Sequence, residues 1–249
     1  MKLLEDDAVV LAGSTGRVGG ATLQTFVREG ARVLVLSREE SRAREAIDRS
    51  VDESARSRAI PFAADLNDPK QAAAAIEACI ANFGRIDAAV SLAGEPLSGK
   101  PLLDSTLDDL YFNLRAFYEP AYNLAMPALK AMLAQSHGKA ARSRGRIVVV
   151  SAGSSKQPAP GRGLFGAAKA AVNVLMQSIA REHKADGIVA NALVLGTVAT
   201  EAAKSYLNEE DYKAAATPQE VADALAFLAS DHGSGINGAL VDLNAREVD

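Results

Sequence analysis

The feature that most constrains the fold is a short apolar run that passes directly into three glycines. Residues 9–12 read Val-Val-Leu-Ala, and glycines follow at Gly13, Gly16 and Gly19. In such a pattern the first glycine allows a sharp turn off a strand. The second lets backbone N–H groups approach a ligand, and the third lets a helix pack closely on the sheet. The spacing therefore predicts a strand, a tight turn and the start of a helix.

A helix that begins directly after such a turn presents unpaired N–H groups and about half a positive charge at its N-terminus. Both features favour the binding of a pyrophosphate, so we predict that a dinucleotide binds at this loop. A tight strand-to-helix turn without a ligand is the alternative. The predicted contacts are Gly13, Ser14, Thr15, Gly16, Arg17, Val18 and Gly19.

Strand-like apolar runs alternate with helical patterns along the chain. The predicted strands cover residues 8–12, 32–37, 59–63, 87–92, 146–151, 188–194 and 239–242. The predicted helices cover residues 16–29, 39–50, 70–82, 106–135, 164–184 and 218–230. Continuous apolar strands are typical of a parallel sheet that is covered on both faces. The pattern predicts one α/β domain over residues 1–249, a Rossmann-type doubly wound parallel sheet of about seven strands with helices on both faces.

Charge and hydropathy narrow the range of partners. The net charge of −4 argues against nucleic acid or an anionic membrane surface as a partner. No apolar run approaches the roughly 18 residues of a membrane span, and the N-terminus turns acidic before a signal-like core forms. We therefore expect a cytoplasmic protein. Cys79 lies in an alanine-rich helical pattern and is expected to be buried.

Two connecting segments leave alternatives open. Residues 200–217 follow the end of a predicted strand, where a substrate lid would be placed, and a pair of surface helices is the alternative. Residues 137–146 are basic and lead into a predicted strand, so they should lie at the edge of the sheet away from the ligand. We expect a solvated loop there, with a docking patch as the alternative. No cluster of side chains has the spacing of metal ligands.

The end of the second predicted strand bears on which dinucleotide is bound. Folds selective for NAD often place an acidic residue at this point, where it binds the ribose 2′-hydroxyl. Here the strand ends in Ser37 and Arg38, and a guanidinium suits a phosphate dianion. Arg17 is also available from the glycine loop. The pattern favours NADP(H), and NAD(H) is the alternative because Glu39 and Glu40 follow directly.

The order of further landmarks resembles the short-chain dehydrogenase/reductase family over essentially the full chain. Residues 91–94, Ser-Leu-Ala-Gly, stand at the family's Asn-Asn-Ala-Gly position. Asn113 matches its active-site asparagine, and Lys169 matches its catalytic lysine. The glycine spacing is instead that of the longer, extended members. Besides the loop, Ser37 and Arg38, the resemblance implies cofactor contacts from Asp65, Leu66, Ala93, Gly94, Lys169, Leu195, Gly196, Val198 and Thr200.

The resemblance also shows where the family's chemistry is altered. The family uses a tyrosine four residues before the lysine and a serine thirteen residues before the tyrosine, and these positions hold Phe165 and Ala152. A phenyl ring has no proton to exchange, and a positioned general acid contributes about 10²–10⁴ in rate. Ordinary carbonyl reduction should therefore be poor or absent, although Asn113 and Lys169 are retained. Candidates for a replacement acid are Ser151 and Ser154, with Ser155, Lys156 and Glu95 nearby.

Three functions are consistent with these residues. The first is an NADP(H)-dependent oxidoreductase with a modified active site and a small-molecule substrate. The second is a non-redox isomerase, lyase or cyclase on the same scaffold, and the third is a catalytically inactive NADP(H)-binding partner protein. Members of the family usually form dimers or tetramers. Residues 164–184 carry small and apolar side chains on more than one helical face, so we expect a homodimer or homotetramer.

Overall fold

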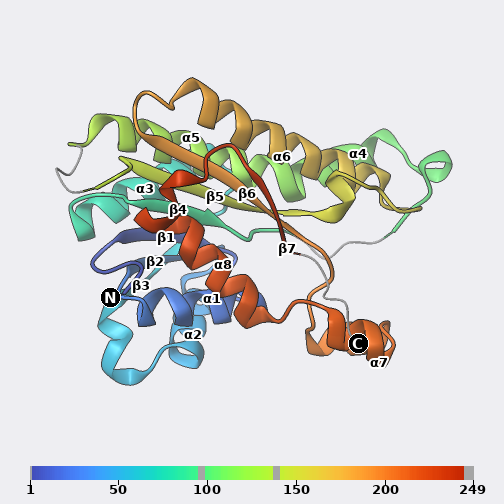
Figure 1. Cartoon of the computed structure of the whole chain (residues 1–249), viewed down its shortest axis with the longest axis horizontal. Coiled ribbons are helices and arrows are strands. Elements are labelled where there is room, and N and C mark those ends of the chain that lie inside the picture. Colours follow the sequence, from blue (N-terminus) through green and yellow to red (C-terminus); the bar gives the residue numbers. More distant parts are fainter. Residues whose placement is uncertain (1, 95–98, 137–140, 244–249) are drawn as a thin grey trace.

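The computed structural model describes residues 2–94, 99–136 and 141–243. Its centre is a seven-stranded parallel sheet with the strand order β3-β2-β1-β4-β5-β6-β7 (Figure 1). The strands are β1 (Ala8–Ala12), β2 (Arg32–Ser37), β3 (Ala59–Ala63), β4 (Ala88–Ser91), β5 (Gly145–Ala152), β6 (Ile188–Leu195) and β7 (Leu240–Leu243). The order reverses between β1 and β4, as in a doubly wound sheet. The predicted fold class is confirmed.

Two helical layers cover the two faces of the sheet. The helices are α1 (Arg17–Arg28), α2 (Glu40–Ser50), α3 (Pro69–Phe83), α4 (Leu107–Asn113), α5 (Glu119–Ala134), α6 (Gly163–Glu182), α7 (Glu209–Ala214) and α8 (Pro218–Ala229). Helices α3, α5 and α6 pack on one face and α1, α2 and α8 on the other (Figure 1). Along β1, Val10 packs into the first layer, whereas Val9 and Leu11 pack into the second. Adjacent strand residues thus supply both cores, which explains the continuous apolar runs.

Helix α6 is the one helix in the described part of the chain that is long and apolar enough to cross a membrane. Its residues Val172, Met176 and Ile179 are buried in the core that it shares with α5 and the sheet. Core helices of globular domains commonly have this composition, so the property carries little weight. Cys79 is buried in the same core, as predicted.

The single helix predicted over residues 106–135 is wrong in one respect, because the structure divides it. Helix α4 ends at Asn113, a π-helical turn covers Leu114–Tyr118, and α5 continues from Glu119. Pro120 has no N–H and so cannot donate the usual hydrogen bond to the carbonyl four residues earlier. The Glu119 N–H instead bonds to the Leu114 carbonyl, five residues back. Such π turns are often found at functional sites.

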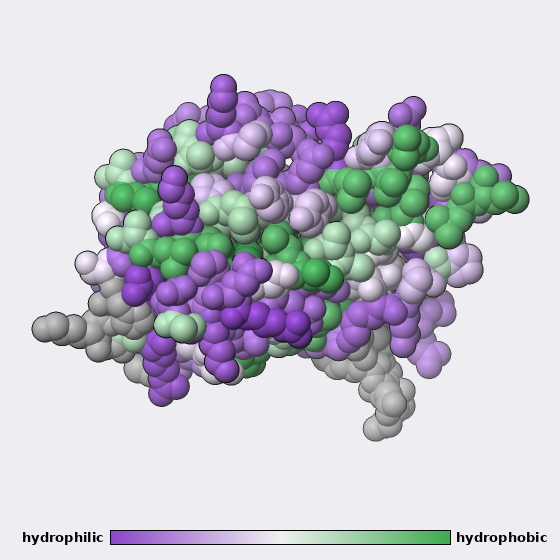
Figure 2. Space-filling model, turned by 90° about the horizontal axis from the view of Figure 1, so that it is seen from above, coloured by the Kyte–Doolittle hydropathy of each residue, from purple (hydrophilic) through white to green (hydrophobic). Residues whose placement is uncertain are grey.

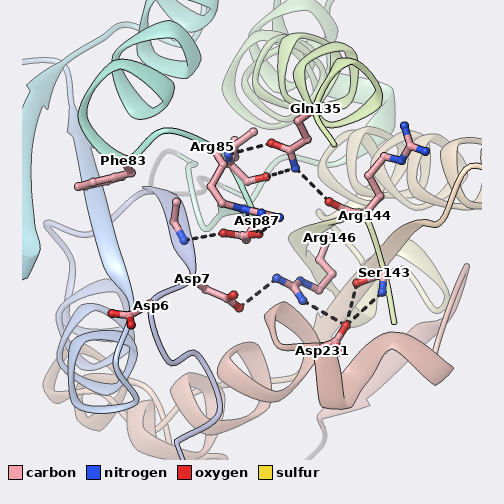
Figure 3. A network of polar contacts seen from close by, with 12 residues as sticks. Asp6, Asp7, Phe83, Arg85, Asp87, Gln135, Ser143, Arg144, Arg146 and Asp231 are labelled. Carbon is pink, nitrogen blue, oxygen red and sulfur yellow. Dashed lines mark hydrogen bonds and ion pairs between the residues drawn. The ribbon is translucent and has the colours of Figure 1, made fainter. Parts of the chain in front are cut away.

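The expectation of a solvated segment at residues 137–146 is wrong for Arg146, whose side chain is buried, while residues 137–140 lie outside the described residues. Arg146 belongs to β5, and its side chain is 4% exposed. It forms ion pairs with Asp7 at 3.0 Å and Asp231 at 3.6 Å (Figure 3). A buried guanidinium is tolerated here because carboxylates from two other parts of the chain compensate its charge. Sequence proximity could not reveal them.

Candidate functional site

A cavity of about 580 Å³ opens at the carboxyl ends of the central strands. Its walls come from the ends of β1, β2 and β4 and from the residues after β3. Thr200 and Ala202, which follow β6, close one side. Ligands of doubly wound sheets bind where the strand order reverses, and this cavity lies beside the reversal between β1 and β4.

The glycine loop forms the floor of the cavity, and its three glycines meet different surroundings. Gly13 has φ +86°, and a Cβ there would lie 2.7 Å from the Leu92 carbonyl carbon. A Cβ on Gly19 would collide with the Gly13 carbonyl oxygen. A Cβ on Gly16 would meet nothing within 4 Å. Gly13 and Gly19 are thus needed for the turn and the packing, whereas Gly16 leaves space open above the loop.

The N-terminus of α1 faces this open space without an internal partner. Gly16 is its N-cap and supplies no side-chain cap, and the first turn holds no acidic residue. The first N–H groups of a helix need acceptors, and a bound anion can supply them. The loop and the helix therefore fit the diphosphate of a dinucleotide.

Most of the predicted cofactor residues line the cavity together. They are Gly13, Thr15, Gly16, Arg17, Val18, Gly19, Ser37, Arg38, Asp65, Leu66, Ala93, Gly94 and Thr200. Lys169, Leu195, Gly196 and Val198 lie outside its lining, and Ser14 is fully buried with no hydrogen-bond partner for its hydroxyl. That these residues bind a cofactor stays a prediction.

The structure adds lining residues that the sequence analysis missed. They are Ala12, Leu36, Arg42, Ala64, Asn67, Leu92, Ala116, Pro120 and Ala202. Arg42 lies in the first turn of α2, whereas Arg38 precedes that helix, so helical spacing alone would not have placed the two together. Arg17, Arg38 and Arg42 line the cavity against one acid, Asp65, among the residues described. The lining therefore favours an anionic ligand.

Lys169 lies on α6 beyond this cavity, against the end of β5. Its ammonium donates a hydrogen bond to the Val150 carbonyl at 2.8 Å and stands 5.1 Å from the centre of the Phe117 ring. The residue is 7% exposed, and burial lowers the pKa of its amine to about 8.

Phe165 lies one helical turn before Lys169 and packs beside the same ring. The Phe165 and Phe117 rings meet edge to face, with centroids 4.9 Å apart. Ala168 completes this small apolar cluster. The side chain at position 165 therefore presents hydrocarbon beside Lys169, and Ala152 at the end of β5 adds no hydroxyl.

Asn113 is the last residue of α4, directly before the π turn. Its amide nitrogen donates to the Asp109 carbonyl at 2.8 Å, whereas its amide oxygen is buried without a partner. Buried polar atoms without partners are uncommon and are often found at functional sites. Asn113 thus carries an acceptor without a partner directly before the π turn, although it does not itself line the cavity.

The candidate replacement acids differ in whether their polar groups are already hydrogen-bonded within the protein. Ser151 is buried, and its hydroxyl lies 3.4 Å from both the Ser155 hydroxyl and the Lys169 carbonyl. Ser155 also accepts a hydrogen bond from Asn173 on α6 at 2.8 Å. Ser151 and Ser155 are therefore engaged with α6 and each other.

Lys156 is also engaged, because its ammonium forms an ion pair with Asp242 of β7 at 2.6 Å. Ser154 is half-buried, and no side-chain hydrogen bond of its own is found within the described part of the chain. Ser154 is thus the candidate whose hydroxyl is least committed. Glu95 lies outside the described residues.

The segment over residues 200–217 forms two short helical turns, Glu201–Ser205 and α7. An isolated bridge between Val198 and Ala216 joins its two ends. The predicted helix pair is therefore present, and Thr200 and Ala202 bring it to the cavity. Its movement as a lid stays a prediction.

Comparisons with known proteins agree with this geometry. The short chain dehydrogenase family model matches residues 7–211. An A-factor type γ-butyrolactone 1′-reductase (1S-forming) from Streptomyces virginiae is 31% identical, over 95% of this chain and 93% of its own length. An L-rhamnose 1-dehydrogenase (NAD(P)(+)) from Sphingomonas sp. (strain SKA58) is 30% identical, over 97% of each chain.

Solved structures show the same fold. A short-chain dehydrogenase from Mycobacterium smegmatis aligns with a TM-score of 0.83 at 26% identity, over 100% of this chain and 95% of that one. A short-chain dehydrogenase/reductase mutant from Serratia marcescens aligns with a TM-score of 0.84 at 21% identity, over 98% of each chain. With the cavity at the strand reversal and the full-length match to relatives, the chain belongs to the short-chain dehydrogenase family of NAD(P)-binding oxidoreductases.

Proposed function

We propose that this protein is an NADP(H)-dependent oxidoreductase that acts on a small molecule through a modified proton-donating site. The observation that carries the proposal is the cavity at the strand reversal, with its open glycine loop and three arginines. Both curated relatives described above are named for oxidation or reduction of small molecules, which supports the same class of substrate.

The preference for NADP(H) rests on the end of β2. Ser37, Arg38 and Arg42 line this part of the cavity, and no carboxylate from β2 or α2 lines it with them. Arg42 lies 3.6 Å from Glu39, an exposed contact that a phosphate dianion can replace. The end of β2 would therefore bind a 2′-phosphate better than a 2′-hydroxyl.

The modified site rests on Phe165 and Ala152. A dinucleotide held by the glycine loop would supply or accept a hydride at this site. Lys169 is held by the Val150 carbonyl, where its amine can orient the nicotinamide end of the cofactor, but Phe165 offers it no phenol to activate. The site therefore suits a substrate that needs no strong acid, or one whose proton comes from Ser154 or from water.

The test has two stages. NADPH and NADH are first titrated by their own fluorescence, and we expect NADPH to bind at least about tenfold more tightly, as one well-placed phosphate contact provides. NADPH oxidation is then followed with carbonyl, enone and imine substrates, in the natural protein and in Phe165→Tyr with Ala152→Ser. We expect the double variant to gain carbonyl reduction.

Two outcomes would change the assignment. Failure of both dinucleotides to bind would contradict the proposal outright. Tight binding of NADPH without oxidation of it by any substrate would favour a non-redox isomerase, lyase or cyclase, or an NADP(H)-binding partner of an active enzyme.

We also propose that the protein forms a homodimer or homotetramer through the layer that contains α4, α5 and α6. Val174 of α6 is 60% exposed, and Tyr111, Phe112 and Tyr122 are exposed on α4 and α5. Figure 2 looks down on this layer and shows apolar surface at the end where α4 lies. Sedimentation analysis should give a dimer or tetramer, and Val174→Glu should shift it toward the monomer. A monomeric natural protein would rule this assembly out.

A further inference from the structure

Arg17 lies at a different end of the cavity from the other two arginines. It is the first residue of α1, and its guanidinium lies 3.9 Å from the Glu201 carboxylate. Glu201 stands between two residues that line the cavity after β6, Thr200 and Ala202. Arg38, in contrast, follows the end of β2, which lies on the other side of β1 from β4, β5 and β6. Arg17 thus spans the cavity from the glycine loop toward the β6 side.

The position of Arg17 relative to the loop indicates which part of a dinucleotide it would meet. Gly16 leaves open space directly above the N-terminus of α1, and that space suits a diphosphate. Arg17 follows Gly16 in the chain, so its side chain leaves the backbone at the rim of this space. The ribose next to the adenine would lie at Ser37 and Arg38 instead.

The Arg17–Glu201 contact is of a kind that an anion can replace. Both side chains are more than half exposed, and exposed ion pairs at such distances are weak and are screened by salt. A guanidinium binds phosphate oxygens through shorter, charge-assisted hydrogen bonds. Glu201 would not be left unpaired, because the Lys204 ammonium lies 2.8 Å away and its hydrogen bond holds the pKa of Glu201 below its usual range.

We propose that Arg17 binds the diphosphate of the dinucleotide and that Glu201 holds Arg17 while the cavity is empty. Binding then transfers Arg17 from Glu201 to phosphate and releases the turn Glu201–Ser205 from the glycine loop. The inference rests on the proposed dinucleotide binding, and it adds a division of roles. Arg17 binds the diphosphate that NADPH and NADH share, whereas Arg38 and Arg42 bind the 2′-phosphate that only NADPH carries.

The first experiment separates these roles by affinity. Arg17→Ala should raise the Kd of NADPH and of NADH by a similar factor, about tenfold for one lost charge-assisted contact. Arg38→Ala should raise the Kd of NADPH alone. The matched control is Arg28→Ala, which removes the same charge from the other end of α1, where Arg28 pairs with Asp223. Arg28→Ala should change neither affinity, and circular dichroism of each variant verifies folding.

The second experiment tests the competition by Glu201. Glu201→Gln should lower the Kd of both dinucleotides about two- to threefold, as expected when a weak exposed ion pair no longer competes. The same substitution in the Arg17→Ala background should have no effect. The control is Glu209→Gln, which removes an acid from α7 that pairs with Lys213. NADPH should also increase amide hydrogen exchange over residues 201–205 in the natural protein but not in Arg17→Ala.

The opposite results would overturn the inference. If Arg17→Ala weakens the binding of NADPH alone, Arg17 binds the 2′-phosphate. If it weakens the binding of neither dinucleotide, Arg17 has no role in binding. If Glu201→Gln also lowers the Kd in the Arg17→Ala background, the lower Kd would come from the change in net charge and not from release of Arg17. Inorganic pyrophosphate, titrated by calorimetry, keeps this test distinct from the proposed function. Its binding should depend on Arg17 even if neither dinucleotide binds, and pyrophosphate binding that ignores Arg17 would refute the inference.

Discussion

The two edges of the sheet are built from the same strands but use polar groups in opposite ways. At the carboxyl edge, the N-terminus of α1 has no side-chain cap and faces a cavity that three arginines line. At the amino edge, carboxylates lie in a network of hydrogen bonds and ion pairs (Figure 3). A helix terminus that opens into a cavity is available to a ligand, whereas carboxylates that pair with distant segments hold the chain together.

The network at the amino edge joins segments that are distant in the sequence. Asp231 accepts hydrogen bonds from the Arg142 and Ser143 amides at 2.9 Å and 3.1 Å, and its carboxylate lies 3.6 Å from Arg146. Asp87 accepts from the Ala8 amide at 2.9 Å and pairs with a neighbouring arginine. The edge opposite the ligand is thus a stabilising element, and changes there should alter stability without altering binding.

The largest effect is expected from Arg146→Met, which removes the buried cation of the network. Breaking a buried ion pair leaves its partners uncompensated and typically costs about 3–5 kcal/mol. Urea unfolding should show a loss of this size, while the Kd for NADPH should stay within about twofold of the natural value because the cavity is at the other edge. A large loss of affinity in folded protein would show that the two edges are coupled.

The next largest loss of stability is expected from a substitution in the glycine loop. Gly13→Ala should cost about 3 kcal/mol, from a strained positive φ and a collision with Leu92, and should abolish dinucleotide binding. Gly16→Ala is the matched control, since its Cβ meets nothing within 4 Å. It should leave the free energy of unfolding within about 0.5 kcal/mol and weaken only binding. Equal destabilisation by both variants would remove the distinction.

Lys169→Met should raise the free energy of unfolding, whereas Arg146→Met should lower it. Burial lowers the pKa of Lys169 to about 8, below the value in the unfolded chain, so protonation costs folding energy below that pH. We expect a gain of about 2 kcal/mol at pH 7 that declines as pH rises from 8 toward 10.5. Urea unfolding at pH 7 and pH 10 measures it. A loss of stability at pH 7 would show that the Val150 hydrogen bond outweighs the cost of burial.

The smallest effect is the pH dependence of Asp7, whose pKa is raised to about 6 chiefly because burial disfavours its carboxylate. A folded-state pKa above the unfolded value gives stability that is complete below about pH 4 and lost as pH rises through 6. We expect a step of about 1–2 kcal/mol between pH 4 and 7. Asp7→Asn should flatten that step in unfolding curves, and a step of unchanged size in the variant would assign it to another group.

Much of the carboxyl edge could be predicted from the sequence, because its signals are local. The glycines at 13, 16 and 19 and the end of β2 at Ser37 and Arg38 act through the backbone or the same turn. The structure places them together in the lining of one cavity. Arg42 was missed because Arg38 precedes α2, so their shared place at the cavity depends on how the chain enters that helix. The break in the predicted 106–135 helix could have been predicted from Pro120, which removes a backbone hydrogen bond inside a long apolar pattern.

The sequence by itself determined the order of strands and helices and the glycine cradle, because hydrophobic period and backbone freedom belong to neighbouring residues. Only the tertiary structure decided that Arg146 is buried between Asp7 and Asp231, that Arg17 meets Glu201, and that Phe165 packs on Phe117. Burial and charge pairing depend on which distant segments the sheet brings together. The sequence around a basic residue therefore does not show whether its side chain is exposed to water or forms part of a buried network.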